Sequence, residues 1–197
     1  MHPNARSRIA ELLLFASNFV RHPHMLGSVI PSSPFLVNQV LKAIDWGRAG
    51  VIVEYGPGVG TFTGEILRRM RSDARLIAIE TNRDFVKFLR GSLPDPRLQV
   101  IHDSAAQVRA VLRRLGAPAA DYIVSGIPLG IMPEPVRANI AGESHAALAP
   151  GGAFLVYQFT ARALPALRRT FGDVRRSFEL CNLPPAQLFV CATRGGA

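Results

Sequence analysis

The sequence predicts a doubly wound α/β domain, in which helices cover both faces of a mostly parallel β-sheet. From residue 50 onward, short β-branched apolar runs alternate with longer helical patterns, as in repeated strand–helix–strand units. The length of 197 residues fits one such domain, and 48% hydrophobic residues are enough for a sizeable core. A glycine-rich segment at residues 56–60 follows the first apolar run, where such folds bind a ligand.

The apolar runs define the expected sheet. The end of the chain differs from the rest, because two apolar segments there flank Leu183-Pro184-Pro185 and so resemble an antiparallel pair that ends the sheet. We therefore expect seven strands in total. They are Val51–Glu54, Leu76–Glu80, Leu98–His102, Asp121–Ser125, Ala153–Phe159, Arg176–Cys181 and Gln187–Thr193.

Helical patterns fill the intervals between the expected strands. Residues 1–46 lie outside this alternation and form a helical extension that is interrupted by Pro23, Gly27, Pro31 and Pro34. The chain thus divides into an N-terminal amphipathic helix and lid at 1–46 and a ligand-binding domain at 47–197. The expected crossover helices are Thr61–Arg71, Asn82–Leu93, Ala105–Leu115, Glu134–Leu148 and Ala161–Thr170.

Charge and cysteine content limit the class of protein. The formal charge of +9, from 23 basic and 14 acidic residues, suits a nucleic acid, an anionic lipid surface, or merely a solvated exterior, and charge alone leaves these open. The two cysteines, Cys181 and Cys191, show neither metal-ligand spacing nor a disulfide framework, which indicates a reduced, cytoplasmic compartment and no metal site. No run reaches the roughly 18 apolar residues of a membrane span, so we expect a soluble or peripheral protein.

The N-terminal extension begins with an amphipathic pattern. Glu11 and Asn18 interrupt its apolar run, so we expect no signal peptide. The helix either docks on its own core or lies in a lipid interface with arginines at the headgroups. In the second interpretation Arg8, Leu12, Phe15 and Phe19 contact the membrane, although Phe15 lies off the main stripe. That stripe contains Ile9, Leu12, Leu13, Ala16, Phe19 and Val20.

The loop Glu54-Tyr55-Gly56-Pro57-Gly58-Val59-Gly60 is the strongest chemical signal. Its glycines permit a tight turn and the close approach of a ligand at a helix N-terminus. A nicotinamide-binding loop would have G-x-G-x-x-G spacing, whereas here the glycines alternate and an acid precedes them. This spacing favours S-adenosylmethionine, whose amino acid tail and sulfonium lie against bare backbone and whose ammonium prefers a nearby acid. The loop therefore predicts a methyltransferase.

Acidic residues at two later strand ends support the same ligand. Glu80, 20 residues after Gly60, ends the second strand, where its carboxylate can accept both ribose hydroxyls. Asp103 follows the third strand and, with Ser104, is placed for the adenine amino group. Each acid alone fits a solvated strand end, but three on one sheet edge favour one ligand. The predicted cofactor-binding residues are Glu54, Tyr55, Gly56, Gly58, Gly60, Thr61, Glu80, Thr81, Asp103, Ser104 and Ser125.

The loop after the fourth strand is placed where an acceptor would meet the donor methyl group. With Gly27–Ser33, the glycine loop and Ala78-Ile79-Glu80, this loop resembles the rRNA adenine dimethylases and, more closely, the bacterial phospholipid N-methyltransferases related to them. The resemblance implies a class I methyltransferase with a Rossmann-like fold. The residues of the loop, which we expect to be catalytic, are Ser125, Gly126, Ile127, Pro128 and Leu129.

The same loop separates the two resembling families. The rRNA enzymes need an Asn or Asp and a terminal aromatic there, to orient and stack the flipped base, whereas Ser125 and Leu129 supply neither. The resemblance therefore implies methylation of phosphatidylethanolamine, through mono- and dimethyl intermediates, to phosphatidylcholine. We expect a monomer on the inner face of the cytoplasmic membrane, with nucleic acid an unlikely partner. After Gln158-Phe159-Thr160, the chain lacks the Tyr-Gly-Pro run of many relatives.

Three further residues are candidates for holding the substrate headgroup, each with a structural alternative. Ser32 and Ser33 precede a helical turn and would hold phosphate or cap a helix that begins near Pro34. Tyr157 would bind the headgroup from the fifth strand or fill the core. An RNA adenine N6-methyltransferase remains the main alternative function, and a noncatalytic adaptor is a third.

Overall fold

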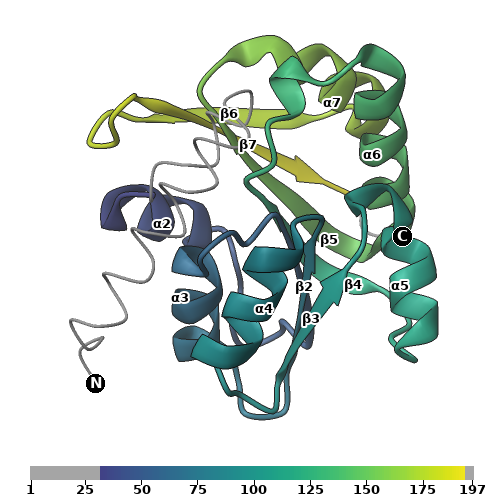
Figure 1. Ribbon diagram of the computed structural model, residues 1–197. Helices are drawn as coiled ribbons and strands as arrows, with labels where there is room; N and C mark the ends of the chain where they lie inside the picture. Colours follow the sequence, from purple (N-terminus) through teal and green to yellow (C-terminus); the bar gives the residue numbers. More distant parts are fainter. Residues whose placement is uncertain (1–31, 194–197) are drawn as a thin grey trace.

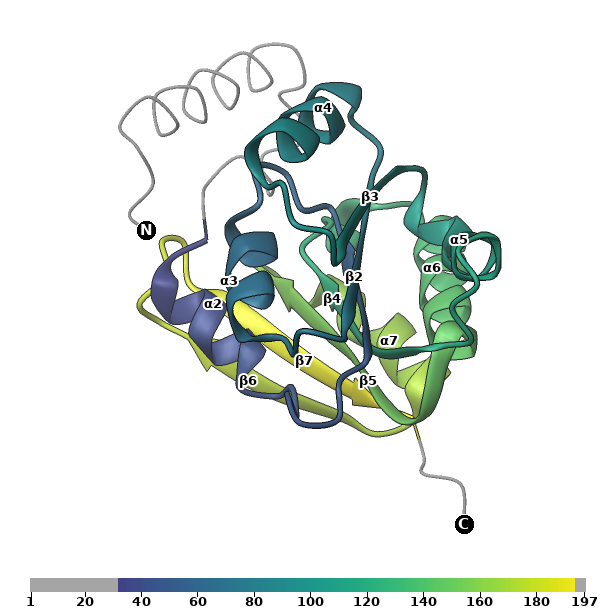
Figure 2. The same cartoon turned by 90° about the horizontal axis from the view of Figure 1, so that it is seen from below.

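The computed structural model describes residues 32–193, in which helices flank both faces of one seven-stranded sheet (Figures 1 and 2). The strand order is β3-β2-β1-β4-β5-β7-β6. β1 to β5 run parallel to one another, and β7 is antiparallel to both β5 and β6. The predicted fold class and the antiparallel end of the sheet are confirmed. The strands are Val51–Tyr55, Arg75–Glu80, Leu98–His102, Ala120–Ser125, Leu148–Gln158, Val174–Glu179 and Ala186–Ala192, for β1 to β7.

The helices differ from the expected ranges only at their ends. Two of the expected helices begin as short 3-10 turns, Ala105–Gln107 and Ala161–Ala163, before the α-helix starts. β5 begins at Leu148 rather than Ala153, because Leu148 pairs with Ala120 across an irregularity in the β4–β5 register. The helices are α2 Pro34–Leu41, α3 Thr61–Arg69, α4 Arg83–Ser92, α5 Val108–Arg114, α6 Glu134–Ala147 and α7 Leu164–Phe171.

The core has two layers because alternate strand residues point to opposite faces of the sheet. On one face, Tyr55, Ile79 and Phe154 pack against the side that α5, α6 and α7 cover. On the other face, Ile52 and Leu76 pack with α2 and α3. All of these side chains are almost completely buried, so the strand ends that carry the predicted site are held on a rigid base.

Helix α2 is the described part of the predicted N-terminal extension. Ser33 caps it, since its hydroxyl accepts a hydrogen bond from the Leu36 amide at 3.2 Å, and Pro34 occupies the first turn. The amphipathic stripe and the predicted membrane contacts Arg8, Leu12, Phe15 and Phe19 lie outside the described residues. Within residues 32–193, no helix is long and apolar enough to cross a membrane.

Candidate functional site

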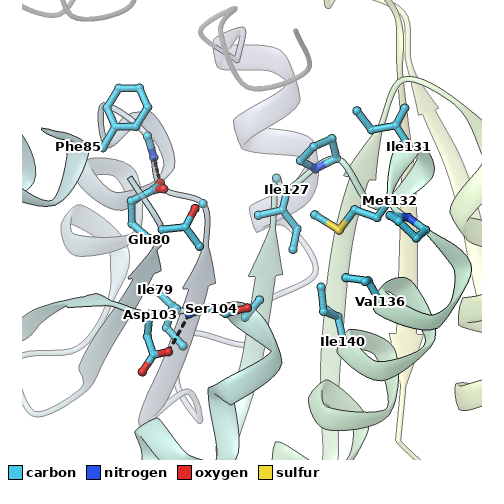
Figure 3. Close-up of a pocket in the computed structure, with 17 residues that line it drawn as sticks. Ile79, Glu80, Phe85, Asp103, Ser104, Ile127, Ile131, Met132, Val136 and Ile140 are labelled. Atoms are coloured by element: carbon cyan, nitrogen blue, oxygen red, sulfur yellow. Dashed lines mark hydrogen bonds between the residues drawn. The ribbon is translucent and has the colours of Figure 1, made fainter. Parts of the chain in front are cut away.

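A cavity of about 400 Å³ opens at the carboxyl ends of β1 to β4 (Figure 3). This is the edge at which doubly wound sheets bind ligands. Residues from β1, β2 and β3 and their following loops form what we call the donor half: Gly56, Gly58, Ile79, Glu80, Thr81, Phe85, Asp103, Ser104 and Ala105. Residues after β4 form the acceptor half: Gly126, Ile127, Pro128, Ile131, Met132, Pro133, Val136 and Ile140.

The glycine loop of the donor half has a backbone that requires glycine. Gly56, Gly58 and Gly60 have φ angles of +66°, +57° and +88°, in the left-handed region. A Cβ atom on Gly56 would lie 2.7 Å from the Cγ2 atom of Ile127, so the two halves of the cavity touch at this point. The loop thus exposes bare backbone to the cavity at the start of α3, as its spacing predicted.

Glu80 lies at the centre of the donor half. Its carboxylate accepts hydrogen bonds from the amides of Asn82 at 2.9 Å and Gly58 at 3.3 Å, and so ties the end of β2 to the glycine loop. Burial raises the pKa of Glu80, although these amides oppose the shift. The side chain still lines the cavity, where its oxygens have lone pairs to offer hydroxyl groups.

Glu54 is the more deeply buried acid, with 3% of its surface exposed. Its carboxylate accepts a hydrogen bond from the Thr63 hydroxyl at 2.7 Å. Burial raises the pKa of Glu54 to about 8, an effect that Thr63 opposes and that the nearby charge of Glu80 reinforces. Burial therefore favours the protonated form of this carboxyl, and a cation placed beside it would favour release of the proton.

Asp103 and Ser104 close the donor half at the end of β3. The Asp103 carboxylate accepts a hydrogen bond from the Ser104 amide at 2.8 Å (Figure 3) and lies 3.5 Å from the Arg114 guanidinium. The Ser104 hydroxyl accepts from the Ala106 amide at 3.3 Å and caps the following turn. Both residues line the cavity, as Glu80 does, whereas the buried Glu54 does not. The three acids predicted at successive strand ends therefore lie at one edge of the sheet, but only two of them face the cavity.

The donor half fits S-adenosylmethionine. Its positive-φ glycines leave room for an amino acid tail, and Glu80 presents a carboxylate where a ribose would lie. Ile79 and Ala105 provide apolar walls beside Asp103 and Ser104 for a purine ring. The roles assigned to these residues remain predictions, but their chemistry and placement agree with that ligand.

A glutamine holds in place the loop Ser125–Leu129, which we call the acceptor loop. The sequence analysis assigned this glutamine no role. Gln158, at the end of β5, donates through Nε2 to the Ile127 carbonyl at 2.7 Å and accepts through Oε1 from the Gly130 amide at 3.0 Å. It is 7% exposed and also donates to the Tyr157 carbonyl. The only signal for this role in the sequence was a glutamine at the end of an apolar strand. The side chain thus bonds to the middle of the loop and to the residue that follows it.

Tyr157 contacts the acceptor loop from the side opposite to Gln158, because neighbouring residues of a strand point to opposite faces of the sheet. A Cβ atom on Gly126 would lie 2.0 Å from the Tyr157 hydroxyl oxygen, so only glycine fits there. The ring stacks on Phe62 with 4.8 Å between centroids, and the hydroxyl bonds to Ser32. Burial raises the pKa of Tyr157, which keeps it a neutral phenol. Tyr157 therefore packs in the core and touches the loop, while it is absent from the cavity wall.

The remaining predicted residues lie at the site without lining the cavity. Tyr55 is buried in the core and its hydroxyl lies 3.1 Å from that of Ser144, so only its backbone faces the glycine loop. Leu129 is also buried, and Thr61 begins α3. Ser125 has a buried hydroxyl without a hydrogen-bond partner in the described part of the chain.

Solved structures confirm the fold. An O-methyltransferase from Bacillus cereus in complex with SAH matches with a TM-score of 0.69 at 12% identity, over 98% of this chain and 93% of that one. An O-methyltransferase from Klebsiella pneumoniae matches with a TM-score of 0.67 at 15% identity, over 100% and 93%. The fold and the site define a class I methyltransferase that uses S-adenosylmethionine.

Sequence relatives narrow this class. The ornithine lipid N-methyltransferase of Singulisphaera acidiphila is 32% identical over 189 residues, which cover 92% of this chain and 95% of that protein. The chain belongs to the family of this enzyme. A family model, Ribosomal RNA adenine dimethylase, matches residues 22–114. The ribosomal RNA small subunit methyltransferase A of Anaeromyxobacter dehalogenans is 41% identical over 76 residues, 37% of this chain and 25% of that one.

Proposed function

We propose that the protein transfers methyl groups from S-adenosylmethionine to the primary amine of a membrane lipid, phosphatidylethanolamine, through mono- and dimethyl intermediates to phosphatidylcholine. One observation carries the proposal. The match to the ribosomal RNA dimethylase model ends at residue 114, before the acceptor loop, whereas the lipid N-methyltransferase matches nearly the whole chain. Similarity to the RNA enzymes is thus concentrated in the donor half.

The lining of the acceptor half supports a lipid amine over a nucleobase. Ile131, Met132 and Val136 are apolar, and no aromatic ring or amide side chain from this half lines the cavity. A flipped base would require a stacking partner and hydrogen bonds to its edge. An amine at the end of a lipid headgroup requires only exclusion of water and correct alignment.

The residues of the chain contribute mainly alignment. When bound, S-adenosylmethionine supplies an activated methyl group on a sulfonium, so in-line placement of the amine provides much of the rate. Gln158 fixes the loop that faces this methyl group. The lipid ammonium, with a pKa near ~10, must lose a proton before it can react. Since the Ile127 carbonyl already accepts from Gln158, the Gly126 carbonyl is the better candidate to orient the amine.

A second acceptor, ornithine lipid, is favoured by the name of the Singulisphaera relative. Its headgroup also presents a primary amine, so the apolar acceptor half suits either lipid. The two acceptors differ in the phosphate, which only phosphatidylethanolamine carries. The donor half makes no distinction between them.

Incubation with methyl-labelled S-adenosylmethionine tests the proposal. Parallel reactions contain vesicles with phosphatidylethanolamine, vesicles with ornithine lipid, or bacterial ribosomal RNA, and the matched control is Glu80→Ala. We expect label in the lipid extract of the phosphatidylethanolamine reaction. Label only in ornithine lipid would show that this lipid, and not phosphatidylethanolamine, is the acceptor. Label only in RNA would overturn lipid methylation.

We further propose that the protein is a monomer, attached peripherally to the inner face of the cytoplasmic membrane and partnered with anionic lipid rather than nucleic acid. The net charge of +9 supports attraction to an anionic surface, and the apolar lining of the acceptor half favours lipid over nucleic acid. Deletion of residues 1–22, or Phe19→Glu, should then weaken vesicle binding and leave cofactor binding intact. Unchanged vesicle binding would remove the N-terminal segment from this role.

A further inference from the structure

The large exposed apolar side chains of the described chain share one edge of the molecule. β4 ends at Ser125, and the loop and helix that follow expose Ile131 and Val136. The other exposed side chains lie on the β6–β7 hairpin and the first turn of α2. Because β7 is antiparallel to β5 and Gln187 pairs with Gln158, the hairpin turn lies beyond the carboxyl end of β5. The six exposed side chains are Phe35, Ile131, Val136, Phe178, Leu180 and Leu183.

The hairpin turn is attached to the acceptor loop through a short series of contacts. The Asn182 side chain accepts from the Ser33 amide at 3.0 Å and donates to the Pro184 carbonyl at 2.8 Å. The adjacent Ser32 bonds to the Tyr157 hydroxyl, which touches Gly126. α2 and the hairpin therefore lie side by side, as both views show (Figures 1 and 2).

The exposure on the hairpin is large. Leu180 and Leu183 are 74% and 84% exposed, on either side of the buried Asn182, and Phe35 is 60% exposed on the adjoining helix. Apolar side chains of this size are more stable when they are removed from water. A group of them on one edge therefore indicates a surface that binds a partner or a membrane. Because the buried Asn182 fixes the turn, the leucines are presented from a held backbone.

Basic side chains accompany this edge. Arg176 on β6 places its guanidinium 4.6 Å from the centre of the Phe178 ring, and exposed Arg162 follows the end of β5. Arginine beside exposed aromatic and aliphatic groups suits an interface between anionic headgroups and acyl chains.

We propose that the β6–β7 turn and the start of α2 form a membrane-docking surface, in which Phe35, Leu180 and Leu183 insert among the lipids of an anionic bilayer beside the acceptor loop. The inference rests on the proposed lipid acceptor, since a lipid amine reaches the cavity without leaving the bilayer only if this edge faces it. It assigns membrane contact to described residues separate from the N-terminal segment.

Cosedimentation with vesicles of phosphatidylglycerol and phosphatidylcholine tests the docking surface. These vesicles contain no acceptor amine, so binding is measured independently of methylation. We expect Leu180→Ser/Leu183→Ser to weaken vesicle binding about tenfold or more, because two apolar side chains are lost from the interface. The matched control is Pro94→Ser/Pro96→Ser, which alters two exposed residues before β3 at the opposite edge and should bind as wild type does.

Calorimetric titration with S-adenosylmethionine shows whether the hairpin variant is folded. If it retains cofactor binding and its vesicle binding is unchanged, the docking surface is overturned. If the hairpin variant loses cofactor binding, Phe35→Ser is tested in its place. We expect Phe35→Ser to weaken vesicle binding, and unchanged vesicle binding would overturn the proposal. If the wild type is a dimer that dissociates in the hairpin variant while vesicle binding is unchanged, the surface binds a second copy of the chain and the proposal is wrong. Failure of wild type to methylate phosphatidylethanolamine would contradict the proposed acceptor and leave the vesicle result standing.

Discussion

The two halves of the cavity are built by different means. In the donor half, polar residues line the cavity, among them Glu80 and Asp103, which we expect to hold a nucleoside. In the acceptor half, the cavity wall is apolar, and the polar groups, such as Gln158, lie behind it and bond to the loop backbone. The donor half can recognise its ligand by direct hydrogen bonds, whereas the acceptor half can act mainly by shape. Substitutions should therefore affect cofactor affinity in one half and turnover in the other.

The largest expected effect tests the donor half. Glu80→Ala removes the carboxylate that ties Asn82 and Gly58 and that we expect to accept the ribose hydroxyls. Hydrogen bonds to a charged group contribute roughly 1.5–3 kcal/mol each, so the cofactor Kd should rise on the order of a hundredfold. Calorimetric titration measures it. A Kd within threefold of wild type would show that Glu80 does not hold the cofactor.

The next effect tests the acceptor half by a change of one methyl group. Gly126→Ala places a Cβ atom against the Tyr157 hydroxyl, which stacking on Phe62 and burial hold in place. We expect the loop to shift and kcat to fall by more than about tenfold, since misplacement of the reacting groups is costly, with the cofactor Kd nearly unchanged. Gly142→Ala, where a Cβ atom meets nothing within 4 Å, is the matched control. Equal activity of the two variants would contradict the proposed packing.

Gln158→Leu also tests whether the acceptor half affects turnover separately from cofactor affinity. It retains the volume and removes both hydrogen bonds to the loop, leaving the Gly130 amide without its side-chain partner. We expect kcat to fall about tenfold with a smaller change in the cofactor Kd, and Gln158→Glu to recover part of the loss if the Gly130 contact matters most. A variant that loses cofactor affinity and turnover equally would show that the two halves are not separable.

The last prediction concerns stability instead of cofactor affinity or turnover, and it tests proton binding by Glu54 beside the donor half. Because burial raises the pKa of Glu54 to about 8 from 4.5, the folded protein binds more protons than the unfolded chain between these values. The free energy of unfolding should therefore fall as the pH rises from about 4.5 to about 8, by up to ~1.4 kcal/mol per pH unit. Urea unfolding at a series of pH values measures it. Glu54→Gln should flatten this dependence, and an unchanged slope would assign it to other groups.

The sequence by itself determined the order of the elements and the donor half. Periodicity predicted the strands closely, except that β5 begins at Leu148 instead of Ala153. Glycines that need positive φ angles and acids at strand ends are local signals, which can be recognised without any knowledge of packing. Only the tertiary structure decided what lies behind the acceptor loop. Gln158 and Tyr157 reach that loop from β5, and Gln158 lies 28 residues beyond its partner Gly130. The hydrogen bonds of Gln158 and the packing of Tyr157 against Gly126 both depend on the β4–β5 pairing. The hairpin surface likewise exists because β6 runs in the same direction as β5 and so brings Leu183 to the edge where the parallel strands end. Local chemistry can be recognised along the chain, but contacts between distant segments are fixed only when the sheet brings them together.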